Sequence, residues 1–171
     1  MAFLDRDGVV TVPQVLDGKG FAVRRVDELR LYDDAADSVA RLAAHGFDVV
    51  IVTNQPDLST GLIDDEELAA MHSLLARRLR LTSIRVCPHV REDACGCRKP
   101  ATGMLLAEDA ASPVDWAASW MVGDRDSDVA AGLAVGCRTV FIERGWRAET
   151  GGSAHVIAST LAEAVDTILA S

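Results

Sequence analysis

The chain has 171 residues, of which 49% are hydrophobic and 25% charged, and its formal net charge is −9 at pH 7. This length and composition favour one globular domain with a sizeable core, and the acidic balance argues against nucleic acid as a partner because no basic stripe is present to replace counterions. No apolar run is long enough to span a membrane and no signal peptide precedes the first run, so we expect a cytoplasmic protein without a membrane partner.

Short apolar runs rich in β-branched residues recur along the chain and predict its strands. They cover residues 2–4, 49–52, 84–86, 120–122, 139–142 and, weakly, 155–157. Helical patterns lie between most of these runs. One ends at Gly46, a glycine that suits a helix C-terminus, and two begin with capping-box pairs, Asp64 with Glu67 and Thr160 with Glu163. Alternating strands and helices predict an α/β fold, a parallel sheet with helices on both faces.

Two carboxylates stand one residue apart where the first apolar run ends, in the segment Asp5-Arg6-Asp7-Gly8. If the run is a buried strand, alternation directs Asp5 and Asp7 toward the same side, and Gly8 allows a sharp turn. Such a pair can bind a divalent cation while one carboxylate attacks an electrophile and the other handles a proton. Taken alone, the segment is explained equally well as a solvated strand end.

Three further polar segments follow in the chain: Thr53–Gln55, Cys97–Pro100 and Gly123–Asp128. Ligands of parallel α/β sheets bind beyond the carboxyl ends of the strands, so the polar residues after the first, second and fourth runs should meet at one edge. Together with Asp5–Gly8, the segments resemble, in the right order, the four motifs of the haloacid dehalogenase (HAD) superfamily of phosphohydrolases. The resemblance spans nearly the whole chain and implies a Rossmann-like sheet.

The resemblance implies hydrolysis of a phosphate ester through an aspartyl-phosphate. It makes Asp5 the nucleophile and Asp7 the residue that protonates the leaving oxygen and later activates water. Magnesium is then bound by the Asp5 carboxylate, the Asp7 main-chain carbonyl and Asp124, oxygen ligands that suit this ion. Asp128 orders the outer shell of the metal or caps the next helix. We assign no role to Asp126, which we expect to be solvent-exposed or to cap a helix.

The second and third motifs are implied to bind the phosphoryl group. Thr53 and Asn54 donate hydrogen bonds to its oxygens, and Lys99 neutralises the phosphate and restrains the nucleophile. Each residue has a simpler explanation when taken alone, since Thr53 could cap a helix and Lys99 could be solvated at the surface. The agreement of the whole set favours the catalytic interpretation.

Residues 87–97, called the cysteine loop below, contain a set of metal-ligand residue types. Cys87, His89, Cys95 and Cys97 supply three thiolates and an imidazole, which suit tetrahedral zinc, although their spacing is tighter than in zinc fingers. The loop is similar to one in the HAD subgroup that contains D-glycero-D-manno-heptose 1,7-bisphosphate phosphatase and histidinol-phosphate phosphatase, where the zinc is structural. The resemblance implies a small zinc-binding loop that fixes the Arg-Lys pair after it; four unligated residues are the alternative.

The resemblance also describes how the site is covered. The short spacing between Thr53 and Lys99 leaves no room for a large inserted cap domain, so we expect a single domain, residues 1–171, with an open site that loops must cover. Residues 9–32 are rich in turn signals and correspond to a flap over the site in the resembling family. They are called the flap segment below.

Four arginines are candidates for substrate binding: Arg24, Arg25, Arg98 and Arg125. Arg98 precedes the third-motif lysine, and Arg125 follows the fourth-motif aspartate. Arg24 and Arg25 lie in the flap segment, where they could contact the far end of the substrate. A solvent-exposed arginine pair explains Arg24 and Arg25 equally well.

We therefore expect a magnesium-dependent phosphomonoesterase that acts on a small phosphorylated metabolite and shows no sign of an obligate protein partner. The heptose bisphosphate is the first candidate substrate. Histidinol phosphate or another sugar phosphate is the alternative, because the cysteine loop is short and Arg125 stands where heptose-bisphosphate phosphatases often carry lysine. A non-catalytic phosphoacceptor or zinc-stabilised binding module is the alternative of a different class, and the complete set of motif residues counts against it.

Overall fold

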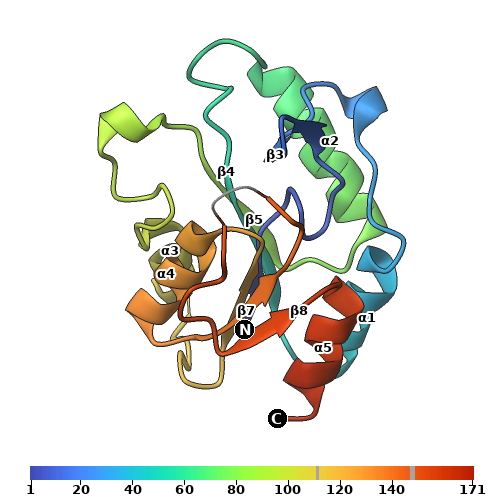
Figure 1. The fold of residues 1–171 in the computed structure, drawn as a ribbon, viewed down its shortest axis with the longest axis vertical. Coiled ribbons are helices and arrows are strands. Elements are labelled where there is room, and N and C mark those ends of the chain that lie inside the picture. The colour runs from blue at the N-terminus through green and yellow to red at the C-terminus, as the bar shows by residue number, and fades with distance from the viewer. Residues whose placement is uncertain (111, 147–148) are drawn as a thin grey trace.

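Among the described residues, the apolar runs of the sequence form the six strands of one parallel sheet, four α-helices lie between these strands in the chain, and a fifth follows the last strand (Figure 1). The computed structural model describes residues 1–110, 112–146 and 149–171. All neighbouring strands of the sheet are parallel. Across the sheet they lie in the order β5 (Ser83–Cys87), β4 (Val49–Asn54), β1 (Ala2–Leu4), β6 (Trp120–Gly123), β7 (Arg138–Ile142), β8 (Val156–Ala158). The predicted α/β fold is confirmed.

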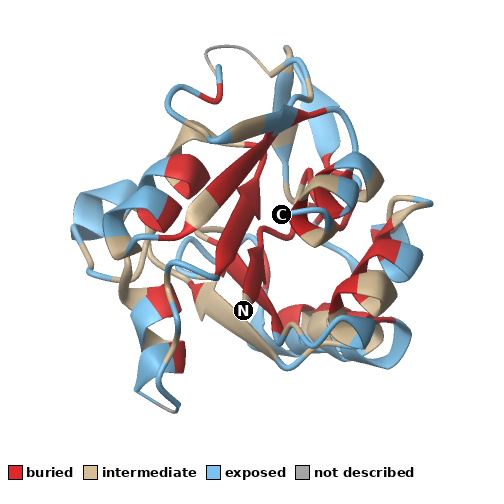
Figure 2. Cartoon of the chain, turned by 90° about the horizontal axis from the view of Figure 1, so that it is seen from below, coloured by how far each residue is buried: buried red, intermediate tan, exposed pale blue. Residues whose placement is uncertain are grey.

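Helices cover both faces of the sheet. Successive residues of each strand point to opposite sides, so the apolar strands have an apolar surface on each face that helices bury. Ala2 and Leu4 of β1 pack in one apolar cluster with α1 (Ala35–Ala44), α2 (Asp65–Arg78) and α5 (Leu161–Leu169). Phe3 packs in a second cluster with α3 (Gly103–Asp109) and α4 (Asp126–Val135). Figure 2 shows the buried strands between these two helical layers. Within the described ranges, no helix has both the length and the apolar content needed to cross a membrane.

The predicted capping pairs start two of the helices, although each forms only half of a capping box. The Asp64 side chain accepts a hydrogen bond from the Glu67 N–H at 2.8 Å, and Thr160 Oγ1 accepts one from the Glu163 N–H at 3.1 Å. The Glu67 carboxylate accepts instead from the backbone N–H of Val26 in the flap segment. Glu67 therefore connects α2 to the flap segment.

The flap segment contains a hairpin formed by β2 (Gln14–Leu16) and β3 (Lys19–Phe21), followed by a short 3₁₀ turn at Val26–Glu28. The two hairpin-turn residues, Asp17 and Gly18, have φ angles of 50° and 72°. Positive φ at both positions matches the twist that a two-residue hairpin needs. The chain between β4 and the cysteine loop contains only α2 and β5 with their connections, so the expected lack of a large cap domain is confirmed.

Candidate active site

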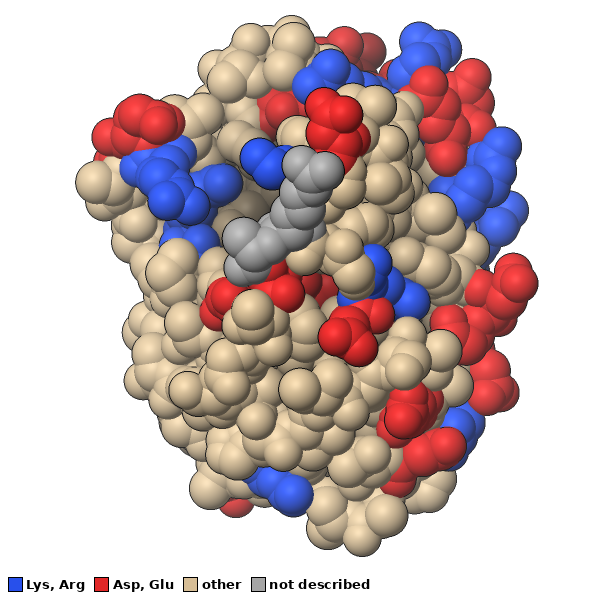
Figure 3. All heavy atoms as spheres, viewed as in Figure 1, with Lys and Arg blue, Asp and Glu red and all other residues tan. Residues whose placement is uncertain are grey.

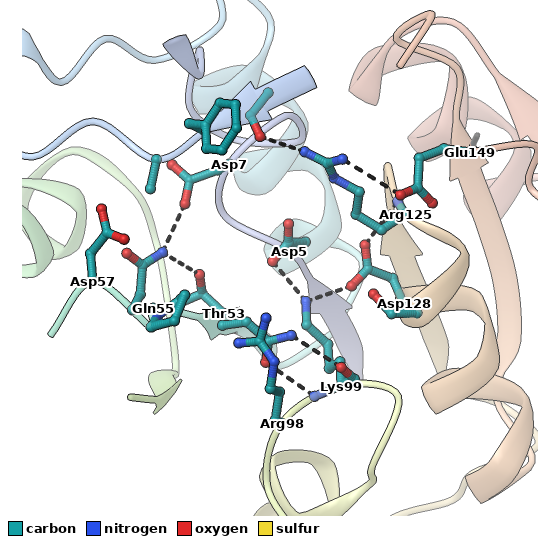
Figure 4. A pocket seen from close by; sticks show the side chains of 16 residues that line it. Asp5, Asp7, Thr53, Gln55, Asp57, Arg98, Lys99, Arg125, Asp128 and Glu149 are labelled. Carbon is teal, nitrogen blue, oxygen red and sulfur yellow. Dashed lines mark hydrogen bonds and ion pairs between the residues drawn. The ribbon is translucent and has the colours of Figure 1, made fainter. Parts of the chain in front are cut away.

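A cavity of about 340 Å³ lies beyond the carboxyl ends of β1 and β4 and at the start of α4 (Figure 4). Its wall contains eight of the predicted site residues: Asp5, Asp7, Thr53, Asn54, Arg98, Lys99, Arg125 and Asp128. The flap segment adds Gly20, Phe21 and Ala22, and the loop between β7 and β8 adds Glu149. All four motifs therefore meet where the alternating pattern predicted, at one edge of the sheet.

Lys99 lies between two buried carboxylates at the base of this cavity. Its ammonium donates to Asp5 Oδ1 and to the Val52 carbonyl, both at 2.7 Å, and pairs with Asp128 Oδ1 at 2.6 Å. Burial works to lower the pKa of Lys99, but Asp128 and Asp5 outweigh it, so the pKa is raised and the cation is fixed. Burial raises the pKa of Asp5 to about 6 against the opposing attraction of Lys99.

Asp124 is not among the described residues that line this cavity, and it has no solvent exposure. Burial and the neighbouring carboxylates Asp5 and Asp128 raise its pKa to about 8. Carboxylate oxygens of these three residues lie within 4.8 Å of one another, and Asp124 Oδ1 has no hydrogen-bond partner among the described residues. Of these three buried carboxylates, Asp5 and Asp128 contact the Lys99 ammonium, and Asp124 Oδ2 lies 3.7 Å from Arg125 Nε. Their remaining negative charge and hard oxygen donors fit a divalent cation such as magnesium.

The Asp7 carboxylate binds side chains from its own loop and from the second motif. Asp7 Oδ2 accepts from Arg6 Nε at 3.0 Å and from Gln55 Nε2 at 2.8 Å, and Asp7 Oδ1 accepts from Thr11 Oγ1 at 3.0 Å. Arg6 is completely buried, and Gln55 is 1% exposed. Roles for Arg6 and Gln55 were not predicted from the sequence. Both belong to motif segments that directly follow apolar runs, because Arg6 lies between Asp5 and Asp7 and Gln55 ends the segment Thr53–Gln55.

Thr53 and Asn54 have different surroundings at the end of β4. Thr53 is buried at the cavity wall, where its hydroxyl accepts from Gln55 Nε2 at 2.8 Å. The Asn54 side chain binds the backbone of Lys99 in both directions, because Oδ1 accepts from the Lys99 N–H at 3.1 Å and Nδ2 donates to the Lys99 carbonyl at 3.2 Å. This contact connects the second motif to the third and was not predicted.

The start of α4 positions the fourth motif. Asp128 Oδ2 accepts from the Arg125 N–H at 3.1 Å, while Asp128 Oδ1 pairs with Lys99, so the residue caps the helix and also reaches the site. Asp126 had no assigned role. Its Oδ1 accepts from the backbone N–H groups of Thr150 at 3.2 Å and Gly151 at 2.8 Å. Asp126 therefore binds the loop between β7 and β8.

Arg98 and Arg125, two of the candidates for substrate binding, line the cavity. Arg98 Nη1 donates to the His89 carbonyl at 3.1 Å, which ties it to the cysteine loop. Arg125 Nη2 donates to the Gly20 carbonyl of the flap segment at 2.7 Å, and its Nη1 lies 3.5 Å from Glu149 Oε1. Figure 3 shows one group of Lys and Arg side chains over the cysteine-loop region, at the left of the view, and others along the right edge.

Arg24 and Arg25 are not among the described residues that line the cavity. Arg24 Nε donates to Asp57 Oδ2 at 2.7 Å, and Asp57 itself belongs to the cavity wall. Arg25 Nε donates to Asp27 Oδ1 at 3.1 Å, and both side chains are mostly exposed. The structure therefore brings Arg24 to the rim through Asp57 and leaves Arg25 at the surface.

The predicted ligands of the cysteine loop form one compact cluster. Nδ1 of His89 and the sulfurs of Cys87, Cys95 and Cys97 all lie within 4.8 Å of one another, and the cysteines are free. Burial raises the pKa of the Cys87 thiol to about 12. At Cys95, hydrogen bonds from the backbone N–H groups of Arg98 and Cys97 outweigh desolvation and lower the pKa to about 6. Three sulfurs and one imidazole nitrogen match a closed tetrahedral zinc site.

The fold and this constellation define a phosphatase of the HAD type. A family model described as HAD-hydrolase-like matches residues 96–164. The solved structure of D,D-heptose 1,7-bisphosphate phosphatase from B. bronchiseptica, complexed with magnesium and phosphate, is similar with a TM-score of 0.81 and 30% identity, covering 99% of this chain and 97% of that one.

Curated relatives give the more particular assignment. D-glycero-β-D-manno-heptose-1,7-bisphosphate 7-phosphatase of Yersinia pestis is 36% identical over 154 residues, which cover 83% of this chain and 79% of the relative. The Pseudomonas aeruginosa protein of the same name is 34% identical over 157 residues, covering 89% and 85%. The chain belongs to this family of heptose-bisphosphate phosphatases within the HAD superfamily, and the family expected from the four motifs is confirmed.

Proposed function

We propose that this protein is a magnesium-dependent phosphatase that removes the 7-phosphate of D-glycero-β-D-manno-heptose 1,7-bisphosphate. The relatives bear that enzyme's name, and the solved neighbour holds magnesium and phosphate. The observation that carries the proposal is the contact of the Lys99 ammonium with Asp5 at 2.7 Å in the cavity wall, beside two further buried carboxylates. A nucleophile and fixed positive charge are what transfer of a phosphoryl group requires.

In the first chemical step, an Asp5 oxygen attacks phosphorus while the bond from phosphorus to the substrate oxygen breaks. Lys99 binds Asp5 Oδ1, and this supports attack by the other oxygen. Asp7 gives a proton to the leaving alkoxide. In the second step, water attacks the aspartyl-phosphate and gives a proton to Asp7, so inorganic phosphate is released and both carboxyl groups return to their starting states.

The side chains around Asp7 and Lys99 orient these groups. Arg6 and Gln55 bind the Asp7 carboxylate at 3.0 and 2.8 Å, which fixes its direction between the first and second motifs. Asn54 binds the backbone of Lys99 and keeps its ammonium near Asp5. The Thr53 hydroxyl is available at the cavity wall for a phosphoryl oxygen.

Magnesium would be bound by the carboxylates of Asp5 and Asp124 and the main-chain carbonyl of Asp7, with Asp128 ordering the outer shell. The buried, unpartnered Oδ1 of Asp124 supports this ligand set among the described residues. When bound, the ion supplies positive charge that offsets the phosphoryl oxygens. Asp124 is ionised when it serves as a ligand, although burial and the neighbouring carboxylates of Asp5 and Asp128 raise its pKa to about 8 in the absence of the ion.

Zinc would be structural and would bind the cysteine-loop ligands Cys87, His89, Cys95 and Cys97. The closed set of four protein donors leaves no position for water or substrate. Arg98 donates to the carbonyl of His89, and Lys99 follows directly, so an ordered loop would hold both cations at the cavity wall. The zinc therefore acts on catalysis through the position of Arg98 and Lys99.

A phosphate-release assay with purified protein and magnesium tests the proposed substrate. The panel contains the heptose bisphosphate, histidinol phosphate and a small generic phosphate ester. We expect the highest kcat/KM for the heptose bisphosphate. Faster turnover of histidinol phosphate would favour the alternative substrate, and no release from any compound would favour the non-catalytic binding module. The single-domain organisation and the cytoplasmic location stay predictions.

A further inference from the structure

The described parts of the loop between β7 and β8, residues 143–146 and 149–155, contact the first and fourth motifs. On the side of β7, Arg144 Nε donates to the Gly8 carbonyl at 2.7 Å, and the Arg144 guanidinium lies 4.0 Å from the centre of the Tyr32 ring. Gly8 belongs to the first motif. This part of the loop is therefore bound directly to the turn that follows the predicted nucleophile.

The far side of the same loop binds the start of α4. Glu149 Oε2 accepts from the backbone N–H of Asp126 at 2.8 Å, and Asp126 Oδ1 accepts from the backbone N–H of Gly151 at 2.8 Å. Asp126 lies two residues after Asp124 in the fourth motif. Contacts on both sides of Trp146 thus hold the loop to the first and fourth motifs.

Trp146 is the residue of this loop that reaches Asp124. Its indole Nε1 donates a hydrogen bond to Asp124 Oδ2, and the indole is partly buried. Arg125 Nε lies 3.7 Å from the same oxygen. The backbone of Gly8, which has a φ of +92°, also lies close to Asp124 Oδ2. A Cβ added at Gly8 would lie 2.1 Å from this oxygen. Among the described residues, the other oxygen, Oδ1, has no partner.

We propose that Trp146 is a positioning residue for the metal site: its indole N–H binds one oxygen of Asp124 and so presents the other oxygen to the divalent cation. This inference rests on the proposed magnesium-dependent function. Donors that bind the free side of a ligating group fix its orientation, and their removal typically lowers metal affinity by about 10- to 100-fold. Trp146 belongs to none of the four motifs, and only the fold brings it to Asp124.

Trp146 also packs against the flap segment, so its ring must be separated from its N–H in any test. An added Cβ at Gly20 would lie 3.2 Å from Trp146 Cζ2, which places the indole against the hairpin. Trp146→Phe keeps an aromatic ring in this position and removes the N–H donor. A pure packing role therefore predicts little change in metal affinity, whereas the proposed role predicts a loss.

The test is a Mn²⁺ titration of the full, zinc-containing chain, with free Mn²⁺ measured by electron paramagnetic resonance. Trp116→Phe is the matched control, because Trp116 is also partly buried but stacks on Phe3 at 5.9 Å. We expect Trp146→Phe to raise the Kd for Mn²⁺ by about 10- to 100-fold, Trp116→Phe to leave it unchanged, and Asp124→Asn to raise it further.

The outcomes separate this inference from the proposed function. If Trp146→Phe binds Mn²⁺ as the wild type does while Asp124→Asn binds weakly, Trp146 has no positioning role and the magnesium site stands. If the wild type binds no Mn²⁺, or Asp124→Asn has no effect, the proposed metal site fails and the inference fails with it. If thermal denaturation shows that Trp146→Phe does not fold, benzothienylalanine at position 146 removes the N–H from a ring of nearly the same shape, and the same loss of affinity is expected.

Discussion

At the scale of single residues, Lys99 sets the balance of charge in the site. It is 4% exposed and contacts Asp5 at 2.7 Å and Asp128 at 2.6 Å, so one buried cation serves two buried anions. Removing one member of such a buried group leaves an uncompensated charge, which costs more than the pair contributes. We therefore expect loss of Lys99 to destabilise the folded protein, in addition to removing the phosphate-binding charge proposed for it.

The nucleophile can be tested by a change that keeps its shape. Asp5→Asn removes the anionic attacking oxygen, so we expect kcat for a generic phosphate ester to fall by at least about 1,000-fold, with the circular dichroism spectrum retained. Asp57→Asn is the control, because Asp57 lines the same cavity and has no role in the proposed chemistry. Turnover by Asp5→Asn near the wild-type rate would mean that no aspartyl-phosphate forms on Asp5.

His72 should make stability depend on pH. Burial and the neighbouring Arg6, whose Nη1 contacts His72 Nε2 at 3.3 Å, lower the pKa of His72 from 6.5 to about 4. Between these two pH values, His72 is protonated in the unfolded chain but neutral in the folded protein. The contribution of neutral His72 to the free energy of unfolding is therefore fully present above the unfolded pKa and is lost as the pH falls toward the folded pKa.

His72→Gln removes the titrating group and retains an acceptor for Arg6. We expect the wild type to lose about 1–2 kcal/mol more unfolding free energy than His72→Gln between about pH 8 and about pH 5. Urea denaturation of both proteins at both pH values, with the same magnesium concentration, measures this difference. Parallel pH profiles would show that His72 is protonated as readily in the folded protein as in the unfolded chain.

At the level of secondary-structure elements, the cysteine loop connects the proposed zinc ligands to the third motif. Cys95→Ser removes one of four proposed zinc ligands, so we expect lower thermal stability, less than one zinc per chain and weaker binding of inorganic phosphate together. Elemental analysis, thermal denaturation and calorimetric phosphate titration measure the three effects. Cys137→Ser, which changes a buried cysteine outside the loop, should keep its zinc. Full zinc content in Cys95→Ser would remove Cys95 from the ligand set.

The strands and the motif positions could be predicted from the sequence because both depend on local pattern. Apolar runs identify the strands, and polar residues directly after a run, such as Thr53 and Asp124, must lie at the carboxyl edge of a parallel sheet. The capping pairs predicted the start of α2 and α5 for the same reason, since a cap binds backbone three residues away.

The contacts that the sequence did not predict join segments far apart in the chain. Asp126 looked like a solvent-exposed or capping residue because nothing near it in sequence indicates that it binds the backbone of Thr150 and Gly151. Trp146 carries no motif, and its contact with Asp124 depends on the path of the loop between β7 and β8. Arg24 was a candidate because its charge suits phosphate. In the fold its Nε instead binds the carboxylate of Asp57, at 2.7 Å from Oδ2.

For the whole molecule, we expect the open cavity and the arginines that line it to govern the choice of substrate. A bisphosphate carries a second anionic group away from the reacting centre, and binding there can help to orient the reacting end. Arg98 lines the cavity and Arg25 does not. We expect the heptose bisphosphate to exceed the matching 7-monophosphate in kcat/KM, and Arg98→Ala to reduce this preference while Arg25→Ala keeps it.

The effect of Arg98→Ala should be about 1.5–3 kcal/mol in the ratio of the two kcat/KM values, the usual range for a hydrogen bond to a charged group. Steady-state kinetics with both substrates measures this ratio for the wild type and both variants. An unchanged ratio in Arg98→Ala together with a reduced ratio in Arg25→Ala would move the second anion-binding position from Arg98 to the flap segment.

This protein is proposed to hydrolyse one particular phosphate ester. The most direct test is phosphorus NMR of the heptose 1,7-bisphosphate, incubated with the protein and magnesium. The proposed function predicts that the 7-phosphate signal is replaced by inorganic phosphate while the 1-phosphate signal remains, and that Asp5→Asn leaves both signals intact. Loss of the 1-phosphate signal, or no release of phosphate by the wild type, would contradict it.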